Sequence, residues 1–483
     1  MTPRRTAPWR RVLVAGLAGL LAATSCGGAD EPDAPGDGAA AVDGSDEIDE
    51  IGAAAALCPV DALGPTGPAV EIELWHAMSA TTGVVLDDLV ATYNAGQDRV
   101  HVTPVYQGGY RDNFNKYIST LRSGGDRPSM IQLNETSMQQ MVDSQSIVAV
   151  ENCVLAADHG LGDHPPWLLD QYRIDGVLVT MPFQLAAPVL YYDGNDFVAA
   201  GLDPDDPPAT LVELEAVSTT LVASGVVPSA LALDVDAWPF EQWVNTAGVP
   251  LVDNDNGRSG RAERSLLDST AVTDVLEVLA RMEEAGHLQT TGRGGEQAAL
   301  GKFLAVAFGD ASMTIASSAS LGEIYNQIDQ VPTVDLRVGP FPGLSGGTLA
   351  VGGGSLYLTD DTSDAERAAV WDFMTWLNEP AQQVAWAAGT GYIPTRISAT
   401  SDPDLQALWA ERPGYRVAFD QLGQPGELAG GGGPVIGDFL GFRDAIEDGL
   451  EAMYAGTDPA TTQAQMVEAA NEAIGEYNRR IGE

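Results

Sequence analysis

Hydrophobic and polar positions alternate strictly at residues 70–74, a pattern typical of a half-buried β-strand. Residues 81–93 then place apolar side chains at helical spacing behind two threonines that can cap a helix. Further strands are predicted at residues 100–106 and 130–133, and further helices at 110–123, from Thr136, and at 211–223, 271–285, 365–377 and 462–479. The alternation of strands and helices predicts a largely parallel sheet covered by helices, an α/β fold.

The N-terminal residues have the pattern of an export signal. Four arginines within the first 11 residues precede an apolar run at 12–23, which is too short for a comfortable membrane span. The run ends in Ala23-Thr24-Ser25-Cys26, which resembles a bacterial lipobox with alanine where leucine is usual. The resemblance implies a signal peptide at 1–25, acylation of Cys26 and anchoring to the outer side of the cell membrane. An ordinary secretory signal followed by an incidental cysteine is the alternative, and it also exports the protein.

Residues 26–56 are mostly glycine, alanine and acidic residues, with few large apolar side chains. Such a segment buries little surface, so we expect a disordered acidic tether. Export to an oxidising space would allow Cys58 and Cys153 to form a disulfide. Two free thiols are the alternative.

Charge narrows the range of partners. The 483 residues include 24 Lys and Arg against 68 Asp and Glu, a formal net charge of −44. Binding to nucleic acids or to anionic lipids needs clustered basic residues. The excess of acidic residues therefore argues against both kinds of partner. A hydrophobic content of 45% nevertheless predicts a globular protein of two or three domains or lobes.

Motifs of catalysis are missing from the sequence. The five histidines form no metal-binding pattern, no G-x-S-x-G motif occurs, and the glycine-rich stretches at 343–354 and 430–433 match no phosphate-binding loop. We therefore expect no enzymatic activity, no metal and no cofactor.

Several segments carry a family pattern. They include Glu73-Leu74-Trp75-His76-Ala77-Met78, Val105-Tyr106-Gln107-Gly108-Gly109-Tyr110, Pro188-Val189-Leu190-Tyr191-Tyr192, Ser317-Ser318, Gly352-Gly353-Gly354 and Thr390-Gly391-Tyr392. In order and spacing these resemble the maltose-binding-like family of extracellular solute-binding proteins of ABC importers. The resemblance is greatest to its glycerol-3-phosphate-binding branch.

The resemblance implies a two-lobe periplasmic-binding-protein-like fold (type II), with a ligand cleft between hinge-linked lobes. Lobe one is expected at 67–180 plus 315–370, and lobe two at 185–312 plus 376–483.

The resemblance also implies seven ligand-binding residues: Tyr110, Glu135, Trp238, Ser317, Gly353, Tyr392 and Arg443. In this interpretation Arg443 binds phosphate oxygens, Glu135 accepts from glycerol hydroxyls and Trp238 forms an apolar wall. Structural alternatives are open: Ser317 as a helix cap, Arg443 as a local ion pair, and the aromatic residues as core. One departure concerns residues 184–187 (Gln-Leu-Ala-Ala), where the branch places a serine that would donate to phosphate.

The implied function is that of a monomeric, lipid-anchored binding protein that delivers glycerol 3-phosphate or a glycerophosphodiester to ABC permease subunits. A maltose-type sugar-binding protein of an importer is the main alternative. A secreted hydrolase, or a sensor or adhesion lipoprotein, are further alternatives.

Overall fold

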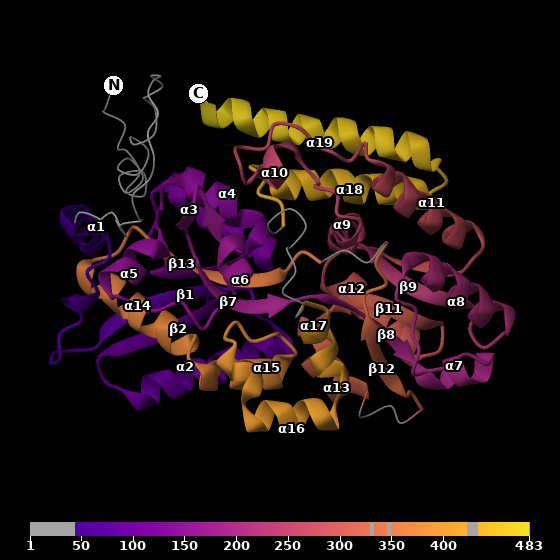
Figure 1. Ribbon diagram of the computed structural model, residues 1–483, viewed down its shortest axis with the longest axis horizontal. Helices are drawn as coiled ribbons and strands as arrows, with labels where there is room; N and C mark the ends of the chain where they lie inside the picture. The colour runs from indigo at the N-terminus through magenta and orange to yellow at the C-terminus, as the bar shows by residue number, and fades with distance from the viewer. Residues whose placement is uncertain (1–43, 329–332, 345–348, 423–432, 483) are drawn as a thin grey trace, which may run out of the picture.

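The computed structural model describes residues 44–328, 333–344, 349–422 and 433–482. The predicted signal peptide, Cys26 and the first part of the tether lie outside these residues. Two separate sheets, each flanked by helices, form two lobes that lie side by side (Figure 1). The predicted two-lobe α/β fold is confirmed.

The first lobe is built on a sheet with the order β2-β1-β3-β13-β4, to which β7 adds by pairing with β13. β1 runs parallel to β2 and β3, whereas β13 is antiparallel to β3, β4 and β7. Its strands are β1 (Val70–His76), β2 (Val100–Tyr106), β3 (Met130–Asn134), β4 (Ile147–Val148), β7 (Met181–Ala186) and β13 (Gly352–Thr359), beside the ribbon β5 (Arg173–Ile174) and β6 (Val177–Leu178). Its helices are α1 (Gly44–Leu57), η2 (Val60–Ala62), α2 (Ala80–Gly96), α3 (Tyr110–Ser123), η3 (Glu135–Ser137), α4 (Met138–Ser144), α5 (Val150–Ala156), α6 (Pro166–Gln171), α14 (Asp364–Leu377) and α15 (Pro380–Thr390).

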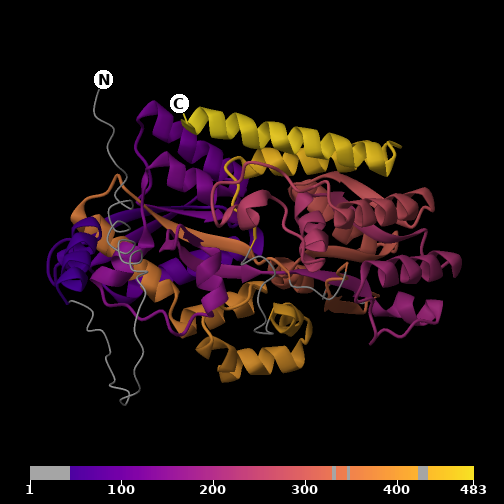
Figure 2. The ribbon, with the colours of Figure 1, turned by 45° about the horizontal axis from the view of Figure 1, so that its top comes forward.

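The second lobe is built on a sheet with the order β10-β9-β11-β8-β12. β9 runs parallel to β10 and β11, whereas β8 runs antiparallel to β11 and β12. Its strands are β8 (Pro188–Asp193), β9 (Ser229–Val235), β10 (Leu288–Arg293), β11 (Ala311–Ser317) and β12 (Leu336–Pro340). Its helices are α7 (Gly194–Ala200), α8 (Leu211–Ala223), α9 (Ala237–Thr246), α10 (Asp253–Gly257), α11 (Thr270–Glu284), α12 (Glu296–Ala307), α18 (Phe439–Tyr454) and α19 (Pro459–Gly482). Figure 2 shows α19 lying along α18 on the outside of this lobe.

At one crossing between the two sheets, the buried residue Ala187 alone joins β7 to β8. The crossing is held by Ser318, whose backbone N–H donates to the Ala187 carbonyl at 2.9 Å and whose hydroxyl accepts from the Ala187 N–H at 3.4 Å. Further elements form a connection between the lobes: η4 (Ser318–Ser320), α13 (Leu321–Ile328), η5 (Ser398–Ser401), α16 (Pro403–Glu411) and α17 (Gly414–Leu422). Of these, α13 and α16 pack on α15 of the first lobe, and α17 packs on α16 and on β8 and β12 of the second.

Strand pairing corrects two expected lobe boundaries. The range 315–370 was expected in lobe one, but β12 pairs with β8 in the second sheet, because β8 leaves an edge there for an antiparallel partner. The range 376–483 was expected in lobe two, but α15 packs on α2 of the first lobe. Only after the bridging helices does the chain return to lobe two, as α18 and α19.

The tether prediction is wrong for its last part, because α1 is helical and packs on α5. Four consecutive alanines at 53–56 favour a helix, and Ala54 is fully buried. A disulfide between Cys58 and Cys153 then ties the end of α1 to α5, so the expected cysteine pair is present.

We predict that the pair of substitutions Cys58→Ala and Cys153→Ala lowers the free energy of unfolding. The bond closes a loop with a sequence separation of 95 residues. Without this constraint on the unfolded chain, the free energy of unfolding should fall by about 2–5 kcal/mol. Guanidinium unfolding of the variant and of dithiothreitol-reduced wild type should show the same shift. An unchanged midpoint in both would contradict the prediction.

Candidate ligand-binding site

Three glycines at the start of β13 allow both lobes to approach one strand. A Cβ on Gly352 would lie 2.8 Å from Cζ2 of Trp238, so the indole packs directly on the backbone. Trp238 is half-buried and stands in the first turn of α9, where the Asp236 carboxylate caps the helix by accepting from the Trp238 N–H at 2.9 Å. A second-lobe indole is thereby placed against a first-lobe strand.

The next two glycines contact the first lobe. Gly353 has a φ of 124°, and a Cβ there would lie 2.1 Å from the Gln184 carbonyl oxygen. A Cβ on Gly354 would lie 2.9 Å from the Tyr110 hydroxyl. Only glycine fits such approaches, so Gly353 lets β7 come close to β13, and Gly354 lets the Tyr110 hydroxyl do so.

Amides and hydroxyls form a connected group beside these glycines. The Gln184 Nε2 donates to the Tyr110 hydroxyl at 3.1 Å, and the Gln184 Oε1 accepts from Gln132 at 2.6 Å. The Tyr392 hydroxyl interacts with Tyr110, and its ring stacks on Trp386 with centroids 5.4 Å apart. Burial raises the pKa of both tyrosines, so both hydroxyls keep their protons at neutral pH.

Arg443 of α18 is held by two carboxylates. Its Nε and Nη2 donate to Oε1 and Oε2 of Glu241, each at 2.7 Å, and Nη2 also donates to Glu135 Oε1 at 3.0 Å. Glu241 comes from α9 of the second lobe and Glu135 from η3 of the first. The Phe439 ring covers one face of the guanidinium, with its centroid 4.7 Å from Cζ.

The charges of this cluster do not cancel. Burial raises the pKa of Glu241 to about 7, an effect that Arg443 opposes and that Glu135 and Asp236 increase. Burial alone would lower the pKa of Arg443, but these carboxylates raise it, so the guanidinium stays charged. The local ion pair weighed from the sequence, with Asp444 or Glu447, is replaced by these two glutamates.

Ser317 acts as a helix cap, which was the structural alternative to a ligand-binding role. Its hydroxyl accepts from the Ala319 N–H at 3.2 Å and caps η4. The following Ser318 contacts the segment of Tyr392, because a Cβ on Gly391 would lie 2.4 Å from the Ser318 carbonyl oxygen. The side chain of Ser317 is therefore used locally, and its neighbour Ser318 makes the contact with the segment of Tyr392.

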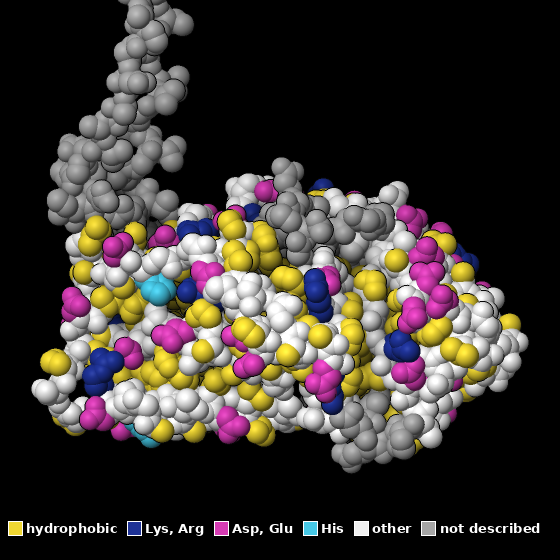
Figure 3. All heavy atoms as spheres, turned by 60° about the horizontal axis from the view of Figure 1, so that its bottom comes forward, with side chains coloured by type: hydrophobic (Ala, Val, Ile, Leu, Met, Phe, Trp, Pro, Cys, Tyr) yellow, Lys and Arg dark blue, Asp and Glu magenta, His cyan; other side chains and the backbone are white. Residues whose placement is uncertain are grey.

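A cavity of about 1060 Å³ opens beside these groups, between the turn from β2 to α3 in the first lobe and α12 and α18 in the second. Tyr110 and Asp236 belong to its wall. Its charged lining residues are Arg111, Asp112, Asp236, Arg293, Asp444, Glu447 and Asp448. Acidic side chains predominate in this lining. On the face of the molecule drawn in Figure 3, acidic side chains are spread over both halves.

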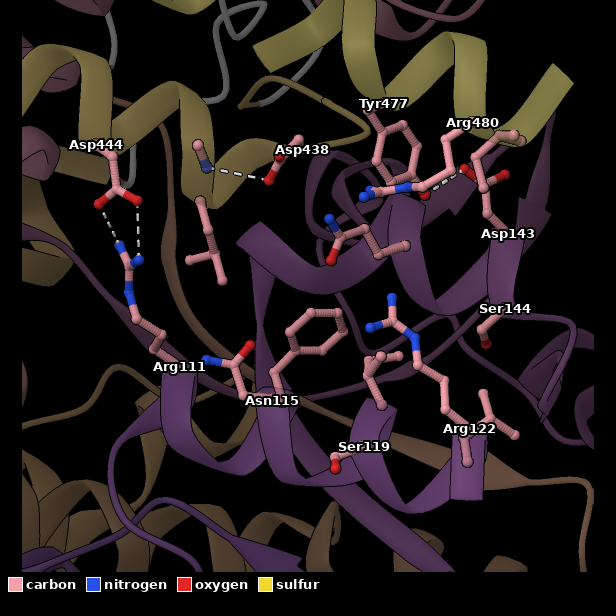
Figure 4. Close-up of a pocket in the computed structure, with 17 residues that line it drawn as sticks. Arg111, Asn115, Ser119, Arg122, Asp143, Ser144, Asp438, Asp444, Tyr477 and Arg480 are labelled. Carbon is pink, nitrogen blue, oxygen red and sulfur yellow. Dashed lines mark hydrogen bonds and ion pairs between the residues drawn. The ribbon is translucent and has the colours of Figure 1, made fainter. Parts of the chain in front are cut away.

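Side-chain bonds tie the lobes together outside the cluster (Figure 4). Arg111 of α3 forms a bidentate pair with Asp444 of α18, at 2.9 and 3.1 Å. Asp143 of α4 accepts from Arg261 at 2.7 and 2.8 Å and from the Tyr477 hydroxyl at 2.8 Å. The pair of Arg111 is well exposed, whereas the Asp143 side chain is only 9% exposed, so Asp143 contributes more to closure.

Of the seven predicted residues, the structure thus groups the side chains of Tyr110 and Tyr392, those of Glu135 and Arg443, and Trp238 beside the glycines. The sequence interpretation missed Glu241, which lies one helical turn after Trp238 and so on the same face of α9. That spacing is the one signal that could have revealed it. It also missed Gln132, whose position on an internal strand gives no sequence signal.

Neither a metal cluster nor a membrane helix is found where the structure is described. No group of three or more potential ligands (His, Cys, Asp or Glu) is placed to hold a metal ion among residues 44–328, 333–344, 349–422 and 433–482. In the same part of the chain, no helix combines the length and apolar character needed to cross a bilayer.

Comparison with known families gives the geometry a context. Residues 88–413 match the family described as bacterial extracellular solute-binding protein. The chain belongs to this family.

Two relatives of this solute-binding protein share a name. The sn-glycerol-3-phosphate-binding periplasmic protein UgpB of Yersinia pseudotuberculosis is 28% identical over 396 residues, which cover 80% of this chain and 88% of the relative. UgpB of Rhizobium meliloti is 25% identical over 418 residues, covering 84% and 94%.

Solved structures share the fold of this solute-binding protein. UgpB of Mycobacterium tuberculosis in complex with glycerophosphocholine has a TM-score of 0.69 at 20% identity, covering 86% of this chain and all of that one. The GacH receptor of Streptomyces glaucescens, determined unliganded and with acarbose, has a TM-score of 0.70 at 15% identity, covering 85% and 100%.

We predict that Asp143→Asn favours separation of the lobes. It removes an ion pair and weakens a tyrosine hydrogen bond across the cleft, and should shift the closed-to-open equilibrium by about five- to tenfold. Small-angle X-ray scattering of the ligand-free protein should then give a larger radius of gyration. Asp360→Asn, which breaks the pair with Arg127 inside lobe one, is the matched control. Equal radii for both variants would contradict the prediction.

Proposed function

We propose that this solute-binding protein serves an ABC importer and binds a glycerol phosphate, in the form of a monoester or a glycerophosphodiester, between its lobes. The observation that carries the proposal is that groups from both lobes meet: Tyr110 and Trp238 lie against the glycines of β13. Arg443 of the second lobe bonds to Glu135 of the first. The names of the relatives support the ligand class, since UgpB proteins are named for sn-glycerol 3-phosphate.

Each part of the group suits one part of such a ligand. The hydroxyls of Tyr110 and Tyr392 can exchange hydrogen bonds with glycerol hydroxyls. The half-buried Trp238 ring offers an apolar wall for the carbon chain. Arg443 supplies N–H donors for phosphate oxygens.

Closure follows from this arrangement. A ligand that contacts Tyr110 and Trp238 together binds the closed form better than the open form, and therefore shifts the population towards closure. The permease subunits would then recognise the closed form. Binding and release, without chemical change of the ligand, is the activity proposed.

A maltose-type sugar is the second candidate. The bidentate bond between Arg443 and Glu241 favours this candidate, because a neutral ligand does not need to compete with Glu241 for the guanidinium. Stacking on Trp238 suits a sugar ring as well.

Titration calorimetry on the chain from residue 27 onwards tests both candidates. We predict micromolar or tighter binding of glycerol 3-phosphate or glycerophosphocholine, and a loss of at least about tenfold in Trp238→Ala. Trp376→Ala removes another half-buried tryptophan, on α14, and should bind like wild type. Binding of maltose alone would establish the second candidate, and no heat from any ligand would refute both.

We also propose that Cys26 carries the lipid anchor, with the permease as the membrane partner of an otherwise monomeric protein. Wild-type protein expressed in bacteria should then partition into the detergent phase of Triton X-114, and Cys26→Ser should remain in the aqueous phase. Aqueous partition of both proteins would indicate an ordinary secretory signal.

A further inference from the structure

Most N–H donors of the Arg443 guanidinium are already bonded within the protein, so few are left for a ligand. Glu241 engages the Nε and Nη2 edge, one of the two edges through which a guanidinium can make a bidentate contact with a phosphate. Phe439 covers one face, and Glu135 takes a further bond from Nη2. Among the described residues Nη1 has no hydrogen-bond partner, so it is the nitrogen left to meet a ligand oxygen.

Glu241 is held in place rather than free to swing away. The residue is 2% exposed, and both of its carboxylate oxygens bond to Arg443. It lies on α9 between Phe240 and Gln242, both buried. A ligand phosphate cannot displace this carboxylate without leaving it buried and unpaired, which is costly.

The charge of the surroundings adds to this geometry. One guanidinium faces the carboxylates of Glu241 and Glu135, and the Asp236 carboxylate also acts on Arg443. The pKa of Glu241 is about 7, so above neutral pH its carboxylate is ionised and the cluster has at least one negative charge in excess. A phosphomonoester carries nearly two negative charges at neutral pH and a phosphodiester one, so the monoester meets more repulsion.

We propose that Glu241 is a specificity-determining residue, whose carboxylate occupies one bidentate edge of Arg443 and so selects glycerophosphodiesters over the monoester glycerol 3-phosphate. This inference rests on the proposed function, since it concerns the same site and the same ligand class. A diester needs one donor, which Nη1 provides, and its second substituent lowers the charge that must be accommodated.

The experiment compares the affinities of glycerol 3-phosphate and glycerophosphocholine by titration calorimetry in wild type and Glu241→Gln. Glutamine keeps the size of the side chain and one acceptor for Arg443, but removes the charge. We expect affinity for the monoester to rise by about tenfold or more and that for the diester by less than about threefold.

Two further variants separate the causes. Glu215→Gln breaks a bidentate pair with Arg281 of the same lobe, at 2.9 Å on both arms and away from the cleft, with the same change in net charge. It should leave the ratio of the two affinities unchanged. Glu241→Asp keeps the charge and withdraws the carboxylate from the guanidinium. It should raise monoester affinity in the same direction but less, and it decides the question if Glu241→Gln does not fold.

The outcomes distinguish the two proposals. Wild type that binds phosphate ligands, with an affinity ratio that Glu241→Gln leaves unchanged, would overturn the role of Glu241 and keep the proposed function. Wild type that binds neither phosphate ligand would refute the proposed function. In that case a gain of monoester binding in Glu241→Gln would still support the role of Glu241, and no gain would overturn it.

Discussion

The bidentate bond between Arg443 and Glu241 sets the conditions for the rest of the cleft. A buried guanidinium must be paired, and the pair must be hydrogen-bonded on both sides to be stable. α9 supplies Glu241 from within the second lobe, so Arg443 is satisfied before the lobes meet. Glu135 of the first lobe then adds a third bond. The cluster therefore links closure to the electrostatics of the site, since separating the lobes would remove Glu135 and leave the second-lobe pair intact.

Glycines make the geometry of closure possible. β13 belongs to the first lobe, yet Gly352 lets the Trp238 indole of the second lobe rest on its backbone. The same strand pairs with β7 at Gly353, whose partner Leu185 lies two residues before the crossing at Ala187. The hinge and the ligand wall are thus built on neighbouring residues, and a small rotation at Ala187 moves Trp238 relative to Tyr110.

Periodicity in the sequence predicted much of the fold. On α2, for example, Leu86, Leu89, Val90 and Tyr93 are buried as their helical spacing indicates. The lobe assignment of β12 could not be predicted in the same way, because it depends on which sheet leaves an edge for an antiparallel strand. α1 was missed because its composition is that of a disordered segment, and packing on α5 together with the disulfide overrides that composition. Similarly, the family pattern placed Arg443 in the site, but its pairing with Glu241 depends on how α9 and α18 cross, which no local pattern contains.

Two features of the site act in the same direction on anion binding. Residues 184–187 contain no hydroxyl side chain, and the Gln184 amide is occupied by Tyr110 and Gln132. A possible donor to phosphate is therefore absent on the β7 side, while Glu241 occupies donors on the α18 side. Both features lower the capacity for negative charge and neither lowers the capacity for hydroxyl groups, because Tyr110 and Tyr392 remain. Under the proposed function, such a site would discriminate by the charge of the ligand's phosphate and still recognise its polyol end, since specificity arises from what is made unfavourable as well as from what is bound.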